Sequence, residues 1–445
     1  MTKTQKNYKI KGGKIIASGG YGCVFRPMLK CAQNNNRSSN KISKLMTNKH
    51  ATQEFDQINK IKQQLVSIPN YKDYFLVYDI TLCHPSKLTA RDLGSFNKKC
   101  TALPKKNITK KNINSKLNQV MSLNLPNGGL PIDDYIYENG SYIKIYNIHI
   151  CLIKLLKYGI IPMNKQHIYH SDIKDSNVLI DKFGKTRLID WGLTVEYKPN
   201  PTLSFPINWK NRPLQFNVPF SVIIFTDTFY TKYTNYLNNG GEVHYLALKP
   251  FVLDYLKIWI KERGAGHYKF INEIMYMLYG NELTDISKNK PSIIESDITI
   301  PTIVNYIVDV LVYYTKFKED GSLNLREYLN HVYIKIVDIW GFLNIYFPLL
   351  ELLSNNYSFL KENDLKILIH IKYLFNEYLY KPRHDPINLN YLFEDLNILG
   401  NLIYKIKTSK YIIKQTSLTK TSETNLFKRK TKLKKFKNPI LLSIK

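Results

Sequence analysis

The sequence predicts an α+β fold in which a β-rich amino-terminal part precedes a mostly helical remainder. β-forming residues flank a glycine-rich stretch over residues 14–26, which indicates two strands joined by a turn. Beyond Pro219, apolar residues recur at helical spacing in long stripes as far as about Ile413. A chain of 445 residues is long enough for two or three packed units, so the two parts can each have a core.

The amino-terminal hairpin is followed by a loop, a strand and a helix. A polar tract over 34–40 predicts the loop, and residues 41–45 predict a short strand. Thr47 or Asn48 can cap the helix that comes next. The apolar residues that recur at helical spacing in this segment are Phe55, Ile58, Ile61 and Leu65.

The middle of the chain returns to a strand before the helical part begins. Residues 84–118 are basic and polar, and no element is assigned to them. Residues 119–125 predict a strand that ends at the Pro-Asn-Gly-Gly of 126–129. A helix is predicted over 142–158 from its apolar spacing. Short strands follow at 178–180 and 186–189, with a turn between them.

Neither a secretory signal nor a membrane span is predicted. Residues 1–14 are polar and basic and have no apolar run. The most apolar long segment, residues 337–353, includes Asp338 and Glu351, so it lacks about twenty uninterrupted apolar residues. We therefore expect this segment to be a buried helix.

The chain is strongly basic. Lys and Arg number 64 against 35 Asp and Glu, a formal charge of +29, which favours acidic partners such as nucleic acid, anionic lipid or acidic proteins. Part of this charge lies in residues 414–445, where ten Lys or Arg accompany one acid, Glu423. We expect a solvated basic tail there that can contact an acidic protein or nucleic acid.

The cysteines predict neither a zinc site nor a disulfide framework. There are five, far apart in the sequence and without a Cys-x-x-Cys pair: Cys23, Cys31, Cys83, Cys100 and Cys151. Reduced thiols in a cytosol-like compartment are therefore expected.

The first motif with chemical meaning is the glycine-rich turn at 18–24, Ser-Gly-Gly-Tyr-Gly-Cys-Val, followed 22 residues after Gly22 by Lys44. Glycines let backbone N–H groups approach a triphosphate, and a lysine on the adjacent strand can hold its phosphates. No Gly-Lys-Ser/Thr follows the glycines, so a Walker A loop is excluded.

The second motif is more specific. It reads His-Ser-Asp-Ile-Lys-Asp-Ser-Asn over 170–177 and, after a gap, Asp-Trp-Gly over 190–192. Phosphoryl transfer from ATP needs a carboxylate to orient the attacking hydroxyl, a cation near the γ-phosphate and oxygen ligands for Mg²⁺. Asp172, Lys174 and the pair of Asn177 and Asp190 supply these groups in that order.

Together these motifs resemble the eukaryotic-type protein kinase superfamily over roughly residues 14–220 and 331–400. The 18 residues between Asp172 and Asp190 are also the family's usual interval. Val337 to Gly341 resembles the start of the buried helix whose aspartate anchors the catalytic loop. The phrases at 20–27 and 43–46 are most similar to serine/threonine kinases of giant DNA viruses.

The resemblance implies ATP and Mg²⁺ as cofactors and a protein serine or threonine as acceptor. It implies that Asp172 and Lys174 are catalytic and that Asn177 and Asp190 bind Mg²⁺. The residues that it places at the nucleotide, with Glu54 as the partner of Lys44, are Ile16, Ala17, Ser18, Gly19, Gly20, Tyr21, Gly22, Cys23, Val24, Ile42, Lys44, Glu54 and Leu179.

The chain departs from the family pattern at several positions. Ala17 stands at the first loop glycine, Ile42 at the alanine over the adenine, and Trp191 at the phenylalanine after the metal aspartate. Ser171 replaces the arginine that commonly reads an activation-loop phosphate. Residues 218–220 lack the glutamate that usually ends this segment, so Arg383 has no obvious partner.

We therefore expect a bilobal kinase-like fold. Its amino-terminal lobe is predicted over 1–127, its carboxy-terminal lobe over 128–413 with a helical insertion at about 221–330, and its basic tail over 414–445. A kinase of viral type would act in the host cytoplasm or the virion, and otherwise in the cytoplasm.

Other classes of protein remain open at this point. A pseudokinase or basic scaffold that binds acidic partners is the alternative, although it usually lacks one of Lys44, Asp172, Asn177 or Asp190. A nucleic-acid-binding protein is favoured by charge alone, without a recognition motif. A small-molecule phosphotransferase of related fold is opposed by Lys174 and the Asp338 segment.

Overall fold

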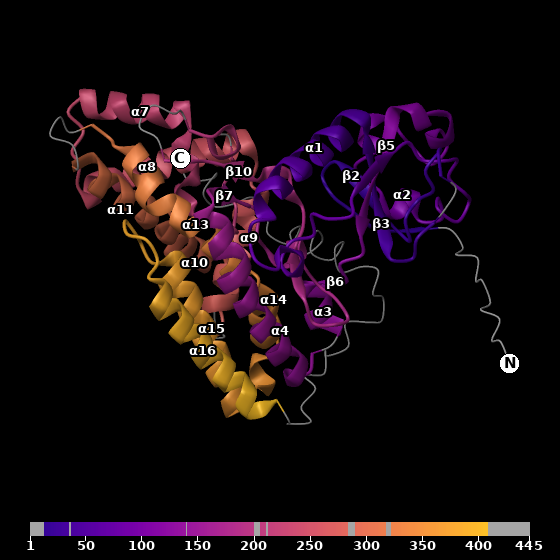
Figure 1. The fold of residues 1–445 in the computed structure, drawn as a ribbon. Coiled ribbons are helices and arrows are strands. Elements are labelled where there is room, and N and C mark those ends of the chain that lie inside the picture. Colours follow the sequence, from indigo (N-terminus) through magenta and orange to yellow (C-terminus); the bar gives the residue numbers. More distant parts are fainter. Residues whose placement is uncertain are drawn as a thin grey trace. The chain divides into compact units, whose positions relative to one another are not determined.

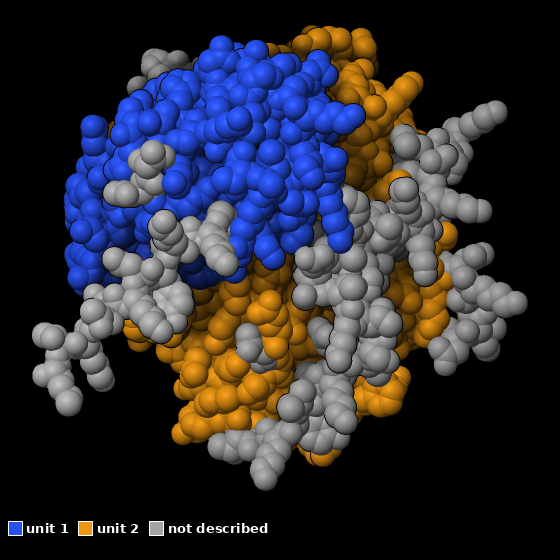
Figure 2. All heavy atoms as spheres, turned by 90° about the vertical axis from the view of Figure 1, so that its right-hand side faces the viewer, with its two compact units in different colours: residues 1–129, 187–192 blue, residues 130–186, 193–445 orange. Residues whose placement is uncertain are grey.

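The computed structural model describes residues 13–34, 37–138, 140–199, 205–210, 212–283, 290–316 and 322–407. It is a mixed α+β structure, as the sequence predicts, and the chain divides into two compact units (Figures 1 and 2). Unit 1 comprises residues 1–129 and 187–192, and unit 2 comprises 130–186 and 193–445. The predicted basic tail at 414–445 lies outside the described residues.

Unit 1 is built on a five-stranded antiparallel sheet with the order β1-β2-β3-β5-β4. The predicted hairpin is present between residues 14 and 26, the strand predicted at 41–45 extends to Thr47, and the strand predicted at 119–125 is shifted by one residue. The strands are β1 (Lys14–Ser18), β2 (Gly22–Arg26), β3 (Lys41–Thr47), β4 (Thr81–Cys83) and β5 (Val120–Pro126).

Helix α1 (Asn48–Leu65) packs against the sheet next to β3 and β5. Its buried residues include Ile58, Ile61 and Leu65, which the helical spacing selects. Thr47 occupies the cap position without a side-chain hydrogen bond, and the Asn48 amide donates instead to the carbonyl of Asn118. The helix is therefore held by burial rather than by the predicted cap.

Residues 84–118, to which the sequence assigns no element, form a cover on the sheet. They contain helix α2 (Phe96–Lys99) and 3-10 turns at Pro104–Lys106 and Ile113–Ser115. Their sparse apolar side chains share one core with the sheet: Leu88, Leu93, Phe96, Cys100, Leu103, Ile108 and Ile113 pack with Ile15, Cys23, Phe25, Leu29, Leu45 and Val120. Several lysines of the segment are exposed, among them Lys98, Lys105 and Lys106, so its basic composition hides this role.

Two disulfides tie this unit together, which corrects the expectation of reduced thiols. Cys23 is bonded to Cys100 and Cys31 to Cys83, while Cys151 is free. The paired cysteines are 77 and 52 residues apart in the sequence. Spacing rules could not reveal them, because the sheet topology alone brings such distant residues to bonding distance.

Unit 2 begins with short strands and helices around the second motif. Strand β6 (Leu130–Pro131) pairs with β8 (Val178–Ile180), and β7 (Ile168–Tyr169) pairs with β10 (Val195–Glu196). Strand β9 (Thr186–Leu188) carries the chain from unit 2 to unit 1. The helices here are α3 (Ile132–Glu138), α4 (Tyr142–Leu155), α5 (Ile161–Lys165) and α6 (Ile207–Lys210).

The segment predicted as one buried helix over 337–353 forms two. Helix α13 (Ile334–Asn344) is buried at every residue except Lys335, and α14 (Phe347–Asn355) follows after a break. Gly341 of α13 lies so close to Ile173 that an added Cβ would be 2.7 Å from its carbonyl oxygen. The glycine therefore lets the central helix approach the segment of the second motif.

The predicted insertion is helical (Figure 1), and its helix α11 contacts α13 through the rings of Tyr306 and Trp340. Helices α8 and α11 pack on each other, and α16 packs on α4 and α15. Their bounds are α7 (Asp227–Asn238), α8 (Tyr245–Arg263), α9 (Gly266–Tyr279), α10 (Lys290–Ile294), α11 (Ile300–Lys316), α12 (Leu325–Tyr328), α15 (Glu362–Phe375) and α16 (Leu389–Ile406).

Three helical stretches of the described chain are long and apolar enough to cross a membrane, judged by length and composition alone. They are Tyr142–Lys165, Lys290–Thr315 and Leu325–Asn355. In the stretch Leu325–Asn355, 94% of the most apolar 18 residues are buried inside the protein, which agrees with the buried helix predicted there. Composition does not exclude a span in the other two, so the absence of a membrane segment stays a prediction.

Candidate functional site

Lys44 of the first motif meets Glu54 and Asp190, the latter from the second motif, in unit 1. These three charged side chains are here called the Lys44 cluster. The Lys44 ammonium is 2.7 Å from both carboxylate oxygens of Glu54 and 3.5 Å from Oδ1 of Asp190. Lys44 lies on β3 opposite Val24 of β2, and Glu54 comes from α1. This is the pairing expected for Glu54, although only ten residues separate it from Lys44.

The electrostatics of this cluster leave room for a further cation. Burial lowers the pKa of Lys44, but Asp190 and Glu54 outweigh it and hold that pKa above its ordinary value, so the amine stays charged. Burial raises the pKa of Glu54, and Asp190 adds to this effect while Lys44 opposes it. Two carboxylates thus share one ammonium, and the Asp190 side chain is 46% exposed.

Asp190 has a backbone conformation that non-glycine residues rarely adopt, with φ of 66°. The segment before it is fixed in unit 1 by backbone hydrogen bonds between Leu188 and both Tyr74 and Leu76. Trp191, after it, is buried with its ring edge on Phe75 at 5.7 Å between centroids. The apolar anchor expected at this position therefore holds the aspartate in a strained but defined geometry.

The glycines of the turn between β1 and β2 have two different roles. An ideal Cβ on Gly19 or Gly20 would meet nothing within 4 Å, so the backbone there is open to a ligand. A Cβ on Gly22 would lie 2.7 Å from the Leu45 carbonyl oxygen and against Met46. Gly22 is therefore required by the close approach of β3, and not only by a phosphate.

The remaining residues expected at the nucleotide divide between the two faces of the sheet. Val24 and Ile42 share the Lys44 face by strand alternation, and both are half-buried. Cys23 is fully buried on the opposite face in its disulfide, so only its backbone can approach a ligand from the Lys44 face. Exposed and part-exposed positions of the turn are Ile16, Ala17, Ser18 and Tyr21.

The second motif builds the Asp172 cluster in unit 2, which consists of Asp172, Lys174, Asn177, Arg212 and Asn217. Lys174 Nζ lies 3.0 and 2.9 Å from the two carboxylate oxygens of Asp172. Asn177 donates its Nδ2 to one of these oxygens at 2.9 Å, and Asn217 donates to the other at 2.9 Å. Arg212 completes the set at 3.5 Å.

This arrangement keeps Asp172 ionised although it is buried. Burial would raise its pKa, but Lys174 and Arg212, together with the hydrogen bonds, outweigh burial and hold the pKa below its ordinary value. Such a carboxylate is a weak base with fixed lone pairs, so its geometry can orient a hydroxyl donor.

Asp338 fixes the backbone of the loop that carries Asp172. Its carboxylate accepts hydrogen bonds from the backbone N–H of His170 and of Ser171, each at 2.8 Å, and from Asn164 at 2.7 Å. Ser171 is held at φ of 60°. Burial raises the pKa of Asp338 above its ordinary value. The aspartate of the central helix thus has the anchoring contacts that the sequence predicts for it.

Sequence reasoning missed three residues of this site: Trp209, Arg212 and Asn217. They lie after the Asp-Trp-Gly of 190–192 in a stretch with no recognisable spacing, and only the fold brings them to Asp172 and Ser171. Arg212 is buried, and its NH1 has no hydrogen-bond partner among the described residues. A buried Arg beside a motif aspartate is visible only in the structure.

Two further residues are placed as follows. Arg383 donates to the carbonyl of Glu377 at 2.8 Å and lies 3.8 Å from its carboxylate, so Glu377 takes the place of the missing partner. Leu179 is buried in β8, two residues after Asn177.

A scan against models of known protein families finds none that matches this chain. Within the described ranges, no group of three or more His, Cys, Asp or Glu side chains converges on a point where a metal ion could bind. A functional assignment must therefore be made from the Lys44 cluster and the Asp172 cluster.

Proposed function

We propose that this protein is a serine/threonine protein kinase that transfers the γ-phosphoryl group of ATP to a hydroxyl of a protein substrate. The observation that carries the proposal is the Lys44 cluster, in which residues 44, 54 and 190 meet although up to 146 residues separate them. Phosphoryl transfer from metal-bound ATP requires a lysine that is held by one carboxylate and has a second carboxylate beside it for the metal. Lys44, Glu54 and Asp190 have this arrangement.

The Lys44 cluster supports the nucleotide part of the proposal. Lys44 stays protonated and is held by Glu54, so it can bind phosphate oxygens as a fixed cation. Asp190 is half exposed, and the Lys44 ammonium that neutralises it is also paired with Glu54. We therefore assign the Asp190 carboxylate to Mg²⁺. When bound, Mg²⁺ neutralises charge on the phosphates and so stabilises the transition state.

Asn177 supports the same assignment from unit 2. Both of its hydrogen bonds are donated by Nδ2, to the carboxylate and the carbonyl of Asp172. An asparagine amide oxygen is a suitable ligand for Mg²⁺, and we assign Asn177 to the metal by its place in the second motif. Val24, Ile42 and Leu179 are the apolar residues that we assign to adenine.

The Asp172 cluster supports the transfer part. Asp172 is ionised and oriented by four donors, so we assign it to accept a hydrogen bond from the attacking hydroxyl and to take its proton late in the reaction. Lys174 bonds this carboxylate in the ground state and can move to the transferring phosphoryl oxygens. Lys174 lies two residues after Asp172, as in the serine/threonine kinases that the sequence resembles. We propose serine and threonine as acceptors for this reason.

In this proposal the two units are the two lobes of a kinase-like fold, and helices α7 to α11 belong to an insertion of unit 2. By the resemblance of its glycine loop, the protein is of the giant-virus type, and we assign it to the host cytoplasm or the virion. The basic tail is assigned to recruitment of acidic partners.

The test is phosphoryl transfer by the purified full chain. It is incubated with labelled ATP, Mg²⁺ and a basic or an acidic protein, and the phosphorylated residues are identified by mass spectrometry. Phosphoserine or phosphothreonine must form with the wild type and with the control variant Asp254→Asn, whose carboxylate is exposed on α8. It must be lost in Asp172→Asn. ATP binding without transfer in the wild type would indicate the pseudokinase alternative instead.

A further inference from the structure

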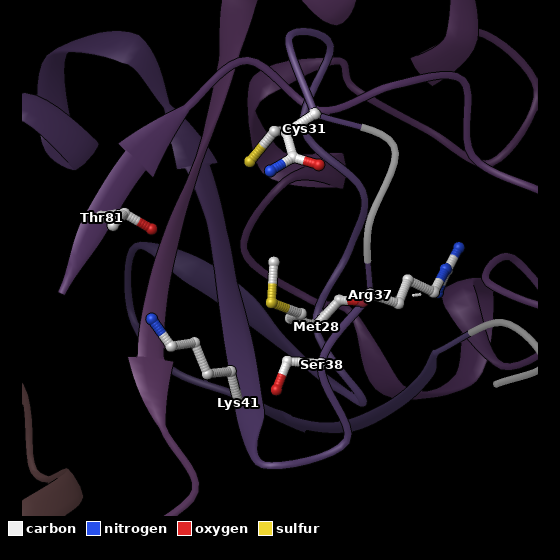
Figure 3. A pocket seen from close by; sticks show the side chains of 7 residues that line it. Met28, Cys31, Arg37, Ser38, Lys41 and Thr81 are labelled. Atoms are coloured by element: carbon white, nitrogen blue, oxygen red, sulfur yellow. Dashed lines mark hydrogen bonds between the residues drawn. The ribbon is translucent and has the colours of Figure 1, made fainter. Parts of the chain in front are cut away.

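A pocket of about 280 Å³ in unit 1 has one half of a disulfide in its wall. Cys31, which is bonded to Cys83 at the end of β4, lines this pocket together with Met28, Arg37, Ser38, Lys41 and Thr81 (Figure 3). Cys31 is partly exposed, whereas Cys83 is 7% exposed. A small molecule in the pocket would therefore meet Cys31 first.

The sulfurs of this disulfide accept hydrogen bonds from one buried amide. Nδ2 of Asn124, on β5, lies 3.4 Å from Sγ of Cys31 and 3.4 Å from Sγ of Cys83. The orientation of this amide is set by its oxygen, which accepts from the hydroxyls of Ser43 at 2.5 Å and Ser122 at 2.9 Å. An N–H group aimed at a sulfur stabilises that sulfur as a thiolate more than as a disulfide.

Two cations line the same pocket. Lys41 is 2.8 Å from the exposed carboxylate of Asp79, and Arg37 forms a nearly buried pair with Asp92 at 2.7 Å. The Arg37 guanidinium is neutralised by the buried Asp92, whereas water screens the exposed partner of Lys41, so Lys41 is the pocket cation that can favour a thiolate. The Asn124 amide and the exposure of Cys31 are the main features that distinguish this disulfide.

The other disulfide of unit 1 lies in a different environment. The Ser18 hydroxyl is 3.7 Å from Sγ of Cys23, a longer contact than the two that the Asn124 amide makes at 3.4 Å. Cys23 and Cys100 are 0% and 2% exposed and belong to the apolar core under the cover formed by residues 84–118. Apolar burial disfavours a thiolate and excludes an attacking thiol. The chain thus contains an internal reference for any reaction at Cys31 and Cys83.

We infer that the Cys31–Cys83 disulfide is a thiol–disulfide exchange site that reacts with small-molecule thiols. The thiolate of the incoming thiol attacks Sγ of Cys31, the bond to Cys83 breaks, and Cys83 leaves as a thiolate held by Asn124. A second thiol then attacks the mixed disulfide and releases Cys31. Two thiols are oxidised to one disulfide, and the protein gains two electrons and two protons as a pair of cysteines. This inference is independent of the proposed kinase activity.

The experiment measures which cysteines become free. The full chain, purified without reductant, is incubated with reduced glutathione, quenched with N-ethylmaleimide at intervals and digested, and modified cysteines are located by mass spectrometry. Cys31 and Cys83 should gain label together at least about tenfold faster than Cys23 and Cys100, since only the first pair is accessible and stabilised as thiolate. Cys151 is free and reports complete alkylation.

Two variants separate the pocket from the amide. Asn124→Ala should slow the labelling of Cys31 and Cys83 several-fold without changing that of Cys23 and Cys100, because it removes the donor to both sulfurs. Ser38 also lines the pocket, but among the described residues it makes no hydrogen bond to either sulfur. The variant Ser38→Ala should therefore leave the labelling rates of both cysteine pairs unchanged. Thermal unfolding of each variant verifies that it is folded. The comparison of the two cysteine pairs in the wild type does not depend on either variant.

Two results would overturn the inference. One is equal or slower reduction of Cys31–Cys83 relative to Cys23–Cys100 in the wild type. The other is the finding of Cys31 and Cys83 as free thiols in protein purified in air without reductant. Neither readout involves nucleotide, so the outcome does not depend on whether the chain transfers phosphate.

Discussion

The indole N–H of Trp209 donates a hydrogen bond of 2.9 Å to the hydroxyl of Ser171, the residue just before Asp172. The Trp209 ring is fully buried and contacts the rings of Tyr169, Tyr197 and Tyr333. A neutral, buried contact thus joins the segment at 205–217 to the loop at 170–177. No phosphate is needed to form it.

The first prediction follows from this contact. Because Ser171 has no charge to be neutralised, activity should not require phosphorylation between Trp191 and Pro219. Enzyme treated with a phosphatase should match untreated enzyme within about twofold in initial rate. Among the hydroxyl candidates, Thr194 is buried, while Thr202 and Ser204 lie outside the described residues.

A tenfold fall on dephosphorylation, restored by preincubation with ATP, would contradict this expectation. The variant Trp209→Phe keeps the ring and loses the N–H, so it tests the contact itself. It should lower the rate measurably in both treated and untreated enzyme, since the contact is permanent. Ile207→Ala, exposed on the same short helix α6, serves as its control.

The second prediction separates the two clusters by substitution. Asp172→Ala and Asp190→Ala should each reduce phosphoryl transfer by about 10³-fold or more, because both act mainly in the transition state. Asp172→Ala should still bind Mg·ATP, whereas Asp190→Ala should lose the dependence of binding on metal. Calorimetric titration with ATP, with and without Mg²⁺, measures the difference. Near-normal turnover of Asp172→Ala would show that the second motif is not catalytic.

The third prediction concerns pH. Lys174 and Arg212 hold the pKa of Asp172 below its ordinary value, so this carboxylate is ionised in the folded protein throughout the neutral range. Its contribution to stability is present above the unfolded-state pKa and is lost as the pH falls through the lower folded-state pKa. In Arg212→Met the pKa of Asp172 should rise, so the acid limb of the rate profile should move to higher pH.

Initial rates across the acid range, measured at saturating substrate, check this expectation. Melting curves at each pH distinguish a shifted pKa from unfolding of the variant. Lys269→Met, on helix α9 of the same unit and outside the Asp172 cluster, is the matched control that removes a cation elsewhere. An acid limb that is unchanged in Arg212→Met would exclude a role for this arginine in the ionisation of Asp172.

The fourth prediction compares two glycines of one turn. Gly22→Ala should destabilise the protein by about 1–3 kcal/mol, because its Cβ would meet the carbonyl of Leu45 and the side chain of Met46. Gly19→Ala meets nothing within 4 Å and should stay within about 0.5 kcal/mol of the wild type. Urea unfolding followed by circular dichroism measures both. Equal stabilities would show that β3 does not constrain the turn.

Much of the local structure could be predicted from the sequence, because strands, turns and helix periodicity depend on neighbours in the chain. The hairpin at 14–26, the strands at 41–45 and 178–180 and the helix with Ile58 and Leu65 belong to this class. The candidate residues Lys44, Asp172, Asn177 and Asp190 could also be selected from the sequence, because they belong to short, recognisable motifs.

The α+β class, the local elements and the candidate motif residues could all be read from the amino-acid sequence. The pairing of Cys23 with Cys100 and of Cys31 with Cys83, the approach of Arg212, Asn217 and Trp209 to the second motif, and the cover that residues 84–118 form on the sheet are visible only in the folded chain. One cause explains all of these differences. These contacts join residues that are 38 to 77 apart in the chain, and their partners are selected by sheet register and helix packing rather than by any local pattern.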